Sequence, residues 1–439
     1  MDTTVGIDLG STTTKAVVLD AAGKVLGRGI TNSRSNYDLA CQVALTEALT
    51  HVRFGFVAAG LSQAGVAPAR ASTLLGVLER RFRCEQYLAQ IDVLERSLMR
   101  VCAAQASASS APLVVGRILD AMRAESASLY AEGASRKSDF FRDLAGSRFL
   151  ALAEQEARAG AVRFDLLVGL FDKAILEVEN TPWEEGAFET QVRAASRAIS
   201  GSTGSDASAL SGAVEHAIGI PIRRLSSVGT GYGRARLPFP KEQIRSEILC
   251  HGLGAHAMFP ATRTVLDIGG QDTKAIQVDE RGIVTSFQMN DRCAAGCGRY
   301  LGYIADEMNL GLHELGPMAQ GSTRSVRINS TCTVFAGAEL RERLSLGEKR
   351  EDIVKGLHRA IVLRAMSLLA RSGGVTDQFT FTGGVAKNPA AVEALKGLIV
   401  ENYGTVSMNI SPDSIYTGAL GAALFARRDA EAAHSGAAA

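Results

Sequence analysis

Residues 8–25 read DLGSTTTKAVVLDAAGKV, and residues 267–284 repeat the pattern as DIGGQDTKAIQVDERGIV. The two stretches are identical at eight of 18 positions, all at the single offset of 259 residues. Identity at one fixed offset indicates an internal duplication, and a duplication constrains the architecture more strongly than any single motif. The sequence therefore predicts two related halves within one chain.

Each copy has the local pattern of a β-hairpin. The apolar residues 5–9 and 265–268 lead into an Asp-x-Gly turn, and a second apolar run then ends at a turn that contains Gly23 or Gly282. This strand–turn–strand order differs from the strand–turn–helix order of P-loop and Rossmann sites. Glycine lets the backbone approach a phosphate closely, and hydroxyl and N–H groups can bind its oxygens. Two such hairpins facing one another would hold the phosphates of one nucleotide from both sides.

A third glycine cluster lies in residues 379–388, which read FTFTGGVAKN. The β-rich run leads into Gly383 and Gly384, and a helix is expected to begin near Pro389. Such a unit places bare backbone where an adenosine can lie against it. A glycine pair after a strand is also typical of a simple tight turn, so the segment alone leaves both interpretations open. Its position after the second hairpin favours a nucleotide site.

The offset of 259 residues is much longer than one such half needs, so the first half is expected to contain an insertion. Apolar residues recur with a helical period in 78–101, and further amphipathic stretches cover 139–157 and 164–178. These patterns predict a largely helical insert over 52–185, whose apolar stripes form a core or face a partner. The Ser/Gly-rich run 200–212 fits either a loop or the start of a helix.

The predicted domain organisation follows from the repeat and the insert. Residues 1–51 plus 186–262 form the first half, 52–185 the insert, 263–427 the second half with a closing helix, and 428–439 a flexible tail.

Composition excludes several classes of protein. The chain has 439 residues, and 47 Lys and Arg against 46 Asp and Glu give a net charge of +1. That balance argues against a nucleic-acid or anionic-membrane protein, which normally carries a basic surplus. Hydrophobic residues at 46% and charged residues at 21% are typical of a globular protein. No apolar run reaches membrane-spanning length, and Asp2 disfavours a signal peptide, so a cytoplasmic location is expected.

Seven cysteines are too few and too scattered for a disulfide scaffold in a chain of this length. Cys293 and Cys297 lie in MNDRCAAGCGRYL, and Cys332 lies in INSTCTVFAGAEL. These spacings match neither a zinc finger nor the short cysteine runs of iron–sulfur proteins. Two subunits that each gave two thiolates would complete a four-cysteine site at a dimer interface. Buried structural cysteines are the alternative that spacing alone favours.

The order of the three glycine motifs resembles the phosphate and adenosine motifs of the acetate kinase, sugar kinase, Hsp70 and actin superfamily. In that superfamily two duplicated RNase H-like domains close over ATP. The resemblance implies an α/β fold of that duplicated ATPase type, with a helical insert in the first half. The ending YTGALGAALFA at 416–426 suits the closing helix, whose small residues allow close packing and hinging.

Further motifs resemble the ATP-dependent electron activators of 2-hydroxyacyl-CoA dehydratases and benzoyl-CoA reductases. They are the two cysteine segments, LDIGGQDTK, GTGYGR at 229–234 and SEILCHGLGA at 246–255. In those families one [4Fe–4S] cluster bridges two ATPase subunits, each of which gives two cysteines. The positions that match the ligand motifs are Cys293 and Cys332. Cys297 stands where a threonine is common, and it is either a silent replacement, which the resemblance favours, or an alternative ligand. Cys250 resembles a structural cysteine.

The length and the opening TNSRSNYDLA at 31–40 resemble the larger ATPase subunit of class I benzoyl-CoA reductase. This resemblance implies three kinds of partner: a smaller related ATPase subunit that shares the cluster, the catalytic reductase subunits, and ferredoxin as electron donor.

The resemblance also assigns roles to the motif residues. Asp8 and Asp267 are expected to hold Mg²⁺, directly or through water, and Gln271 or Asp272 to orient the attacking water. The phosphate contacts are expected from Gly10, Ser11, Thr12, Thr13, Lys15, Gly269, Gly270 and Gln271. The adenine–ribose end is expected to lie against Gly383, Gly384 and Lys387. Lys274 is a further candidate for a phosphate contact, although a lysine of either hairpin equally fits a solvated position.

The implied function is ATP hydrolysis that drives low-potential electrons from ferredoxin through the shared cluster to the catalytic subunits of benzoyl-CoA reductase. An activator of a 2-hydroxyacyl-CoA dehydratase is the first alternative. A small-molecule kinase of the same superfamily is a second one, although it leaves the cysteine motifs unexplained. An Hsp70-like regulatory or binding module is a third.

Overall fold

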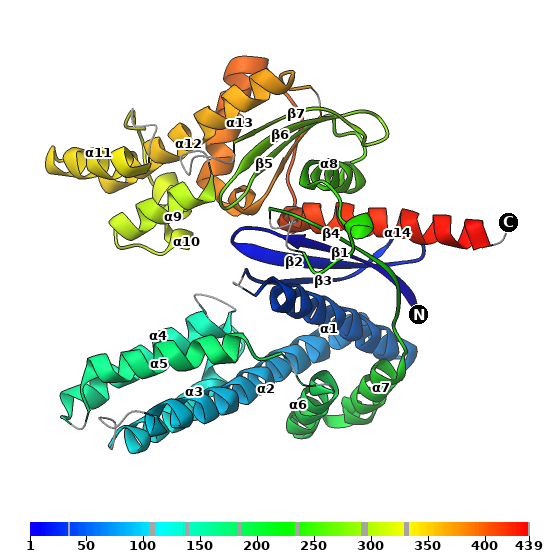
Figure 1. The fold of residues 1–439 in the computed structure, drawn as a ribbon, viewed down its shortest axis with the longest axis vertical. Coiled ribbons are helices and arrows are strands. Elements are labelled where there is room, and N and C mark those ends of the chain that lie inside the picture. Colours follow the sequence, from blue (N-terminus) through cyan, green and yellow to red (C-terminus); the bar gives the residue numbers. More distant parts are fainter. Residues whose placement is uncertain are drawn as a thin grey trace. The chain divides into compact units, whose positions relative to one another are not determined.

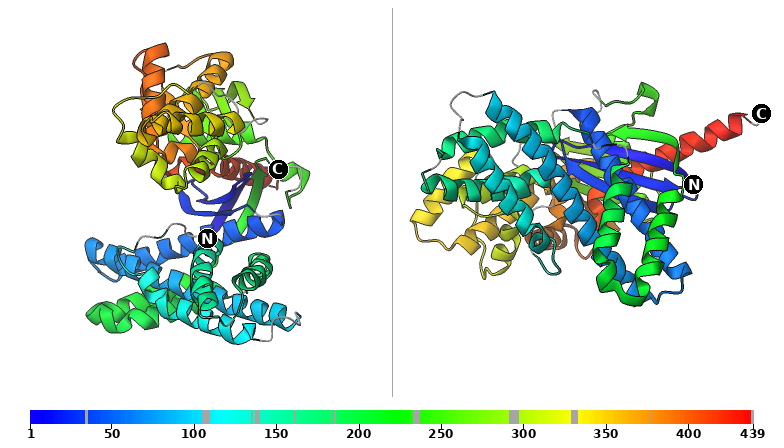
Figure 2. Two further views of the ribbon diagram at one scale, coloured as in Figure 1. Left: turned by 90° about the vertical axis from the view of Figure 1, so that its left-hand side faces the viewer. Right: turned by 90° about the horizontal axis from the view of Figure 1, so that it is seen from below.

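The computed structural model describes residues 1–33, 36–104, 110–134, 136, 140–160, 162–182, 184, 186–232, 237–290, 297–328, 333–376 and 378–437. Their contacts divide the chain into two compact units. The helical unit comprises Met1 and Thr46–Ile222, and the sheet unit comprises Asp2–Leu45 and Arg223–Ala439. All strands found in the described residues belong to the sheet unit (Figures 1 and 2).

The helical unit contains α1 from Thr46 onward and the helices from α2 to α7. These are α1 (Tyr37–Gln63), α2 (Pro68–Ala103), α3 (Ala111–Leu129), α4 (Phe141–Arg158), α5 (Phe164–Glu179), α6 (Ala187–Thr203), the 3₁₀ turn η1 (Gly204–Asp206) and α7 (Ala207–Gly219). The predicted helical character of 78–101, 139–157 and 164–178 is confirmed by α2, α4 and α5. The Ser/Gly-rich run 200–212 covers the end of α6, η1 and the start of α7.

The long helix α2 joins two apolar cores of the helical unit. Its first half packs with α1, α6 and α7. In this core the ring centroid of Phe54 lies 5.3 Å from that of Phe82 and 6.2 Å from that of Phe188, and the centroids of Phe82 and Phe188 lie 5.4 Å apart. Its second half packs with α3, α4 and α5. Because α6 and α7 complete the first core, the helical unit extends to Ile222, beyond the end at 185 that the sequence predicted.

The sheet unit contains two sheets with matching topology. The first has the order β3-β2-β1-β4, from β1 (Asp2–Leu9), β2 (Thr13–Asp20), β3 (Val25–Asn32) and β4 (Arg223–Thr230). The second has the order β7-β6-β5-β8-β9, from β5 (Thr264–Ile268), β6 (Thr273–Val278), β7 (Val284–Asn290), β8 (Phe379–Thr382) and β9 (Met408–Asn409). In the first sheet β1 pairs antiparallel with β2 and parallel with β4. In the second sheet β5 pairs in the same way, antiparallel with β6 and parallel with β8. The predicted hairpins and the duplication are therefore confirmed.

The remaining helices of the sheet unit pack on these sheets or on one another. They are α8 (Glu247–Met258), α9 (Gly298–Glu307), α10 (Leu312–Gln320), α11 (Thr333–Ser345), α12 (Arg350–Ser372), α13 (Pro389–Tyr403) and α14 (Thr417–Ala437), with the 3₁₀ turns η3 (Lys241–Gln243), η5 (Gly384–Lys387) and η6 (Pro412–Tyr416).

Strand alternation decides which helix each side chain of β5 meets. Leu266 and Ile268 belong to the large core with α9 to α13, whereas Val265 packs on the other face against α8. Since side chains alternate between faces with a period of two, Asp267 shares the α8 face with Val265. In the same way Lys274 of β6 shares that face with Ile276, which also packs against α8.

Helices α8 and α14 pack closely against one another (Figure 1). A Cβ atom on Gly254 would lie 2.0 Å from the carbonyl oxygen of Thr417, and one on Gly421 would lie 1.8 Å from that of Cys250. Only glycine allows this approach, which confirms the close packing expected from the small residues of 416–426. The helix α14 also packs on β1, β2 and β4.

The helix α14 continues to Ala437, through most of the segment expected to be a flexible tail. This stretch is rich in alanine, the best helix former, and Asp429 pairs with Arg245 at 2.8 Å. Among the helices of the described residues, none combines the length and apolar character that crossing a membrane requires.

Candidate functional site

The site begins with an aspartate at the end of the central strand of each half. Asp8 lies near the end of β1 opposite Lys15 of β2, and Asp267 lies near the end of β5 opposite Lys274 of β6. Both carboxylates are only 2% exposed. A buried carboxylate is costly unless it is paired or binds a cation, so each of these positions needs a partner.

Lys274 is the most heavily paired side chain of the second half. Its Nζ lies 2.8 Å from Asp272 Oδ2, 2.9 Å from Glu247 Oε1 and 3.3 Å from Asp267 Oδ2. Burial lowers the pKa of Lys274, but the three carboxylates outweigh burial and raise it well above its usual value. The lysine is therefore charged and fully engaged with protein groups, and it corresponds neither to a solvated hairpin lysine nor to a free phosphate ligand.

Asp267 is fixed by three different elements. The Thr382 hydroxyl of β8 donates to its Oδ1 at 2.8 Å, His251 Nδ1 of α8 lies 3.4 Å from the same oxygen, and Lys274 lies near the other oxygen. Burial raises the pKa of Asp267, yet the neighbouring His251 and Lys274 outweigh burial and lower it far below its usual range. The pKa of His251 is lowered by burial and raised more strongly by Asp267, so its net shift is upward.

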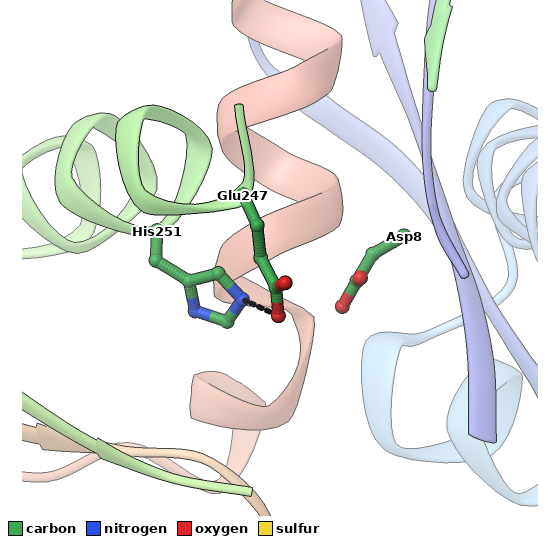
Figure 3. A group of neighbouring side chains, drawn as sticks. All are labelled: Asp8, Glu247 and His251. Atoms are coloured by element: carbon green, nitrogen blue, oxygen red, sulfur yellow. Dashed lines mark ion pairs between the residues drawn. The ribbon is translucent and has the colours of Figure 1, made fainter. Parts of the chain in front are cut away.

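A second group of ligand-type side chains surrounds Asp8. One oxygen or nitrogen atom from each of Asp8, Glu247 and His251 lies within 4.8 Å of the others, and all three residues are buried (Figure 3). Glu247 and His251 are four residues apart on α8, so they share one face of that helix. Burial raises the pKa of Glu247, against the opposing effects of Lys274 and His251.

The Asp8 carboxylate has spare binding capacity. Its Oδ1 is buried and has no hydrogen-bond partner among the described residues, while its Oδ2 lies 3.5 Å from Lys15 Nζ. An unsatisfied buried acceptor costs about 1–3 kcal/mol, and a bound cation would remove that cost. Carboxylate oxygens are also the ligands that Mg²⁺ prefers. The residues present at this point therefore fit a divalent cation.

The local charge supports the same conclusion. The charged and titratable groups that meet here are Asp8, Lys15, Glu247, His251, Asp267, Asp272 and Lys274. Four carboxylates face two lysines and one histidine whose pKa is raised, so acidic groups outnumber basic ones by one, and a bound cation would compensate that excess.

The predicted phosphate-contact residues of the two hairpins lie in or beside two turns that approach one another. The first turn holds Gly10, Ser11 and Thr12, with Thr13 and Lys15 on the following strand β2, and the second turn holds Gly269, Gly270 and Gln271. A Cβ on Gly270 would lie 2.2 Å from Thr12 Oγ1, so a larger residue at that point of the second turn would have to displace the Thr12 side chain. The Gly269 amide also donates to the Asp272 carbonyl at 2.9 Å, which closes the turn.

The third glycine motif joins the same region. β8 pairs in parallel with β5 so that Thr382 is opposite Asp267, and Gly383 follows directly. Gly383 has a φ of +89°, and a Cβ there would lie 2.3 Å from the Ile268 carbonyl oxygen. Gly384 and Lys387 lie on the next turn, η5, and both are exposed. The three motifs are therefore brought together, although each hairpin and turn is far apart in sequence.

Three contributors to the site were not identified from the sequence. Glu247 and His251 lie in the quoted segment SEILCHGLGA, but their spacing of four residues was not used as a signal of a shared helix face. Thr382 was interpreted only as part of a strand. The cluster ligands expected at Cys293 and Cys332 lie outside the described residues, whereas Cys297 is buried and immediately precedes α9.

The matching sheets and the paired turns define a nucleotide-dependent ATPase fold of the duplicated, actin-like type. In agreement, the chain superimposes on component A of the (R)-2-hydroxyglutaryl-CoA dehydratase of Acidaminococcus fermentans with a TM-score of 0.55. The match covers 98% of this chain and 100% of that chain at 23% identity, and it confirms the predicted fold.

The chain belongs to the BadF/BadG/BcrA/BcrD ATPase family, whose model matches residues 5–426. It is 44% identical over 204 residues to the (R)-2-hydroxyglutaryl-CoA dehydratase activating ATPase of Acidaminococcus fermentans, which covers 46% of this chain and 76% of that protein. It is 34% identical over 175 residues to a benzoyl-CoA reductase subunit of Thauera aromatica, which covers 40% of this chain and 62% of that protein. The family resemblance stated from the motifs is thus confirmed.

Proposed function

We propose that this protein is an ATP-hydrolysing electron activator that transfers low-potential electrons to the catalytic subunits of an acyl-CoA-processing enzyme. The main supporting observation is the buried Asp8 oxygen that has no hydrogen-bond partner in the part of the chain that the structure describes, beside Glu247 and His251 and next to two glycine turns. This arrangement suits a Mg²⁺–nucleotide complex, and membership of the ATPase family supports the same assignment.

In the proposed mechanism, phosphoryl cleavage depends on positioning and charge neutralisation more than on covalent chemistry. Asp8 would hold Mg²⁺ directly or through water, and the cation would neutralise charge on the phosphates. Asp267 would support the cation through water while Lys274 fixes its carboxylate in place. The amides and hydroxyls of the two turns would bind the phosphate oxygens.

The attacking water would be oriented by groups near the phosphate turns. Gln271 is half-buried in the second turn and is the main candidate, whereas Asp272 is held by Lys274 and is better suited to closing that turn. Glu247 also contacts Lys274, at 2.9 Å, but it is a further candidate because burial raises its pKa and so makes the carboxylate a stronger base.

A direct connection links the second phosphate turn to the cysteine segment. The amide of Gly298 donates to the Gly269 carbonyl and that of Arg299 donates to the Gly270 carbonyl, both at 2.8 Å. These are the first amides of α9, which begins immediately after Cys297. Rearrangement of the turn on ATP hydrolysis would therefore move the start of α9, and this connection supports coupling between nucleotide and cysteines.

Cys293 and Cys332 are the proposed ligands of a [4Fe–4S] cluster shared with a second ATPase subunit. The bound cluster would supply one-electron transfer. The proposed partners are a related ATPase subunit, the catalytic subunits, and ferredoxin as donor.

Two classes of electron acceptor are proposed. Length and motif resemblance favour benzoyl-CoA reductase, in which this chain would be the larger ATPase subunit. The higher identity to a dehydratase activating ATPase, 44% against 34% for the benzoyl-CoA reductase subunit of Thauera aromatica, favours a 2-hydroxyacyl-CoA dehydratase instead.

The first experiment is to measure iron and acid-labile sulfide per chain after anaerobic purification, with and without a related ATPase subunit. We expect about two iron atoms per chain, since a four-iron cluster would be shared by two chains. Cys293→Ser and Cys332→Ser should each lose the iron, whereas the matched control Cys102→Ser, in the helical unit, should retain it.

Iron-free chains that still hydrolyse ATP after reconstitution would contradict the electron-activator proposal and favour a kinase-like ATPase. To decide between the acceptors, the loaded protein is mixed with catalytic subunits of each class, and ATP-dependent reduction of those subunits is followed by absorbance.

A further inference from the structure

A buried histidine of α12 contacts Asn388, the last residue of the third glycine motif. His358 is 1% exposed, its Nδ1 lies 2.8 Å from the Val354 carbonyl oxygen, and its Nε2 lies 3.0 Å from Asn388 Nδ2. None of the roles assigned above uses this side chain. Because both ring nitrogens have partners, the orientation of the imidazole is fixed.

The hydrogen bonds of Asn388 determine which atom donates to which. Its Oδ1 accepts from the amides of Ala390 and Ala391 at 3.0 and 3.2 Å, so the amide group cannot be reversed without losing both bonds. The Nδ2 group therefore faces His358 and donates to Nε2. Since the Val354 carbonyl only accepts, Nδ1 carries the proton. Burial also lowers the pKa of His358, in agreement with a neutral ring.

Asn388 links the glycine motif to the helix that follows it. The backbone amide of Asn388 donates to the Val385 carbonyl at 2.9 Å, and the backbone amide of Ala386 donates to the Gly383 carbonyl at 3.2 Å. Asn388 therefore lies at the end of the 3₁₀ turn η5. The same side chain caps α13. A Cβ on Gly316 of α10 would lie 3.0 Å from Asn388 Oδ1, which shows how closely this amide is enclosed.

We propose that His358 is a positioning residue for the nucleoside end of the nucleotide site. Its Nε2 holds the Asn388 side chain in the orientation that caps α13. The backbone amide of the same residue closes η5, so a fixed Asn388 also fixes the backbone of Gly383 and Gly384. The proposal rests on the proposed function, in which that backbone contacts the adenosine of ATP.

Two substitutions distinguish the contribution of Nε2 from that of Nδ1. His358→Gln can place an amide oxygen near the position of Nε2 and so retain an acceptor for Asn388. His358→Asn can place an amide N–H near the position of Nδ1 and so retain the bond to Val354, but it leaves Asn388 Nδ2 without an acceptor. The pair is matched in chemistry and differs in which contact is kept.

The affinities of both variants for Mg·ADP and for Mg·pyrophosphate are measured by calorimetry on the full chain, with thermal unfolding as a measure of stability. We expect His358→Asn to weaken ADP binding about tenfold, the equivalent of one hydrogen bond, and His358→Gln to stay within about threefold of wild type. Pyrophosphate affinity should not change in either variant, because the two hairpin turns supply its contacts.

Equal ADP affinities in the two variants, or a parallel loss of pyrophosphate affinity, would overturn the positioning role. If the wild-type chain binds pyrophosphate but no ADP, the proposed nucleotide function fails, and this proposal fails with it. Asn388→Asp and Asn388→Ser are the second pair of variants if His358→Asn does not fold. A carboxylate at this position would favour a protonated imidazole that donates from Nε2, so Asn388→Asp should retain the contact and the ADP affinity. The matched variant Asn388→Ser keeps a capping oxygen, removes the donor to Nε2 and should show the selective loss of ADP affinity.

Discussion

The two hairpins carry the same Asp–Lys pair in the same register, but their surroundings differ. Among the described residues Lys15 of the first hairpin forms an ion pair only with Asp8, at 3.5 Å, and its side chain is 13% exposed. Lys274 of the second hairpin is 1% exposed and contacts three carboxylates. Duplication thus conserved the strand geometry while the two copies acquired different electrostatic environments.

The difference arises from two features outside the repeated strands. At the position of Thr13 in the first copy, the second copy has Asp272, which adds one carboxylate. The helix α8 packs on the second sheet and adds Glu247 and His251. The second hairpin is therefore a pre-formed ionic anchor, whereas the first offers an unsatisfied carboxylate oxygen to a ligand. The comparison shows how one duplicated unit can supply both a rigid and a ligand-dependent half of a site.

Replacement of each lysine by methionine is the strongest test of this contrast. Lys274→Met would leave Glu247, Asp267 and Asp272 buried without their cation, and we expect a loss of about 3–5 kcal/mol in the free energy of unfolding. Lys15→Met removes one partially exposed contact and should cost about 1–2 kcal/mol. Urea denaturation monitored by circular dichroism measures both. Equal losses would contradict the assignment of the second hairpin as the ionic anchor.

Replacement of Asp8 or Asp267 by asparagine should affect ATP turnover and stability to different extents. Asp8→Asn is expected to lower ATP turnover by about 10²–10³-fold, as the loss of one electrostatic contact to the reacting phosphates does, with less than about 1 kcal/mol lost in stability. Asp267→Asn should lower turnover and also cost about 3 kcal/mol in stability, because it breaks a buried ionic network. Phosphate release at saturating Mg·ATP and urea denaturation are compared. An Asp8→Asn protein with wild-type turnover would show that Asp8 does not act on the nucleotide.

Substitution of the glycines at the hairpin tips, Gly23 and Gly282, should give the smallest effect on stability. Gly23 and Gly282 both have positive φ, 86° and 76°, so alanine is expected to cost about 1 kcal/mol at either position. A Cβ on Gly282 would also lie 2.8 Å from the His256 ring, whereas one on Gly23 would meet the flexible end of Arg427 at 3.1 Å. Gly282→Ala should therefore lower the melting temperature more than Gly23→Ala does. The reverse order would show that the two tips are packed differently from this description.

The repeat, the hairpins, the strand before Gly383 and the helices of the insert could be predicted from the sequence, because each depends on local periodicity and turn residues. The two buried aspartates and the three glycine turns were also identified in this way. The extent of the helical unit was not, since Val192 and Leu210 join the core around Phe82 only when α6 and α7 fold back on α2.

Strand alternation is written in the sequence, so it alone determines that Asp267 shares a face with Val265 and Asp8 with Gly6. Both faces of these strands are apolar, however, and a pattern that is apolar on both faces does not say which helix covers which face. Only the tertiary structure decides that α8 lies over the second sheet and brings Glu247 and His251 to the aspartates. The same holds for the contact of His358 on α12 with Asn388, the residue that caps α13, 30 positions further along the chain. Charge and hydrogen bonding act between neighbours in space, and those neighbours exist only once the apolar faces have packed.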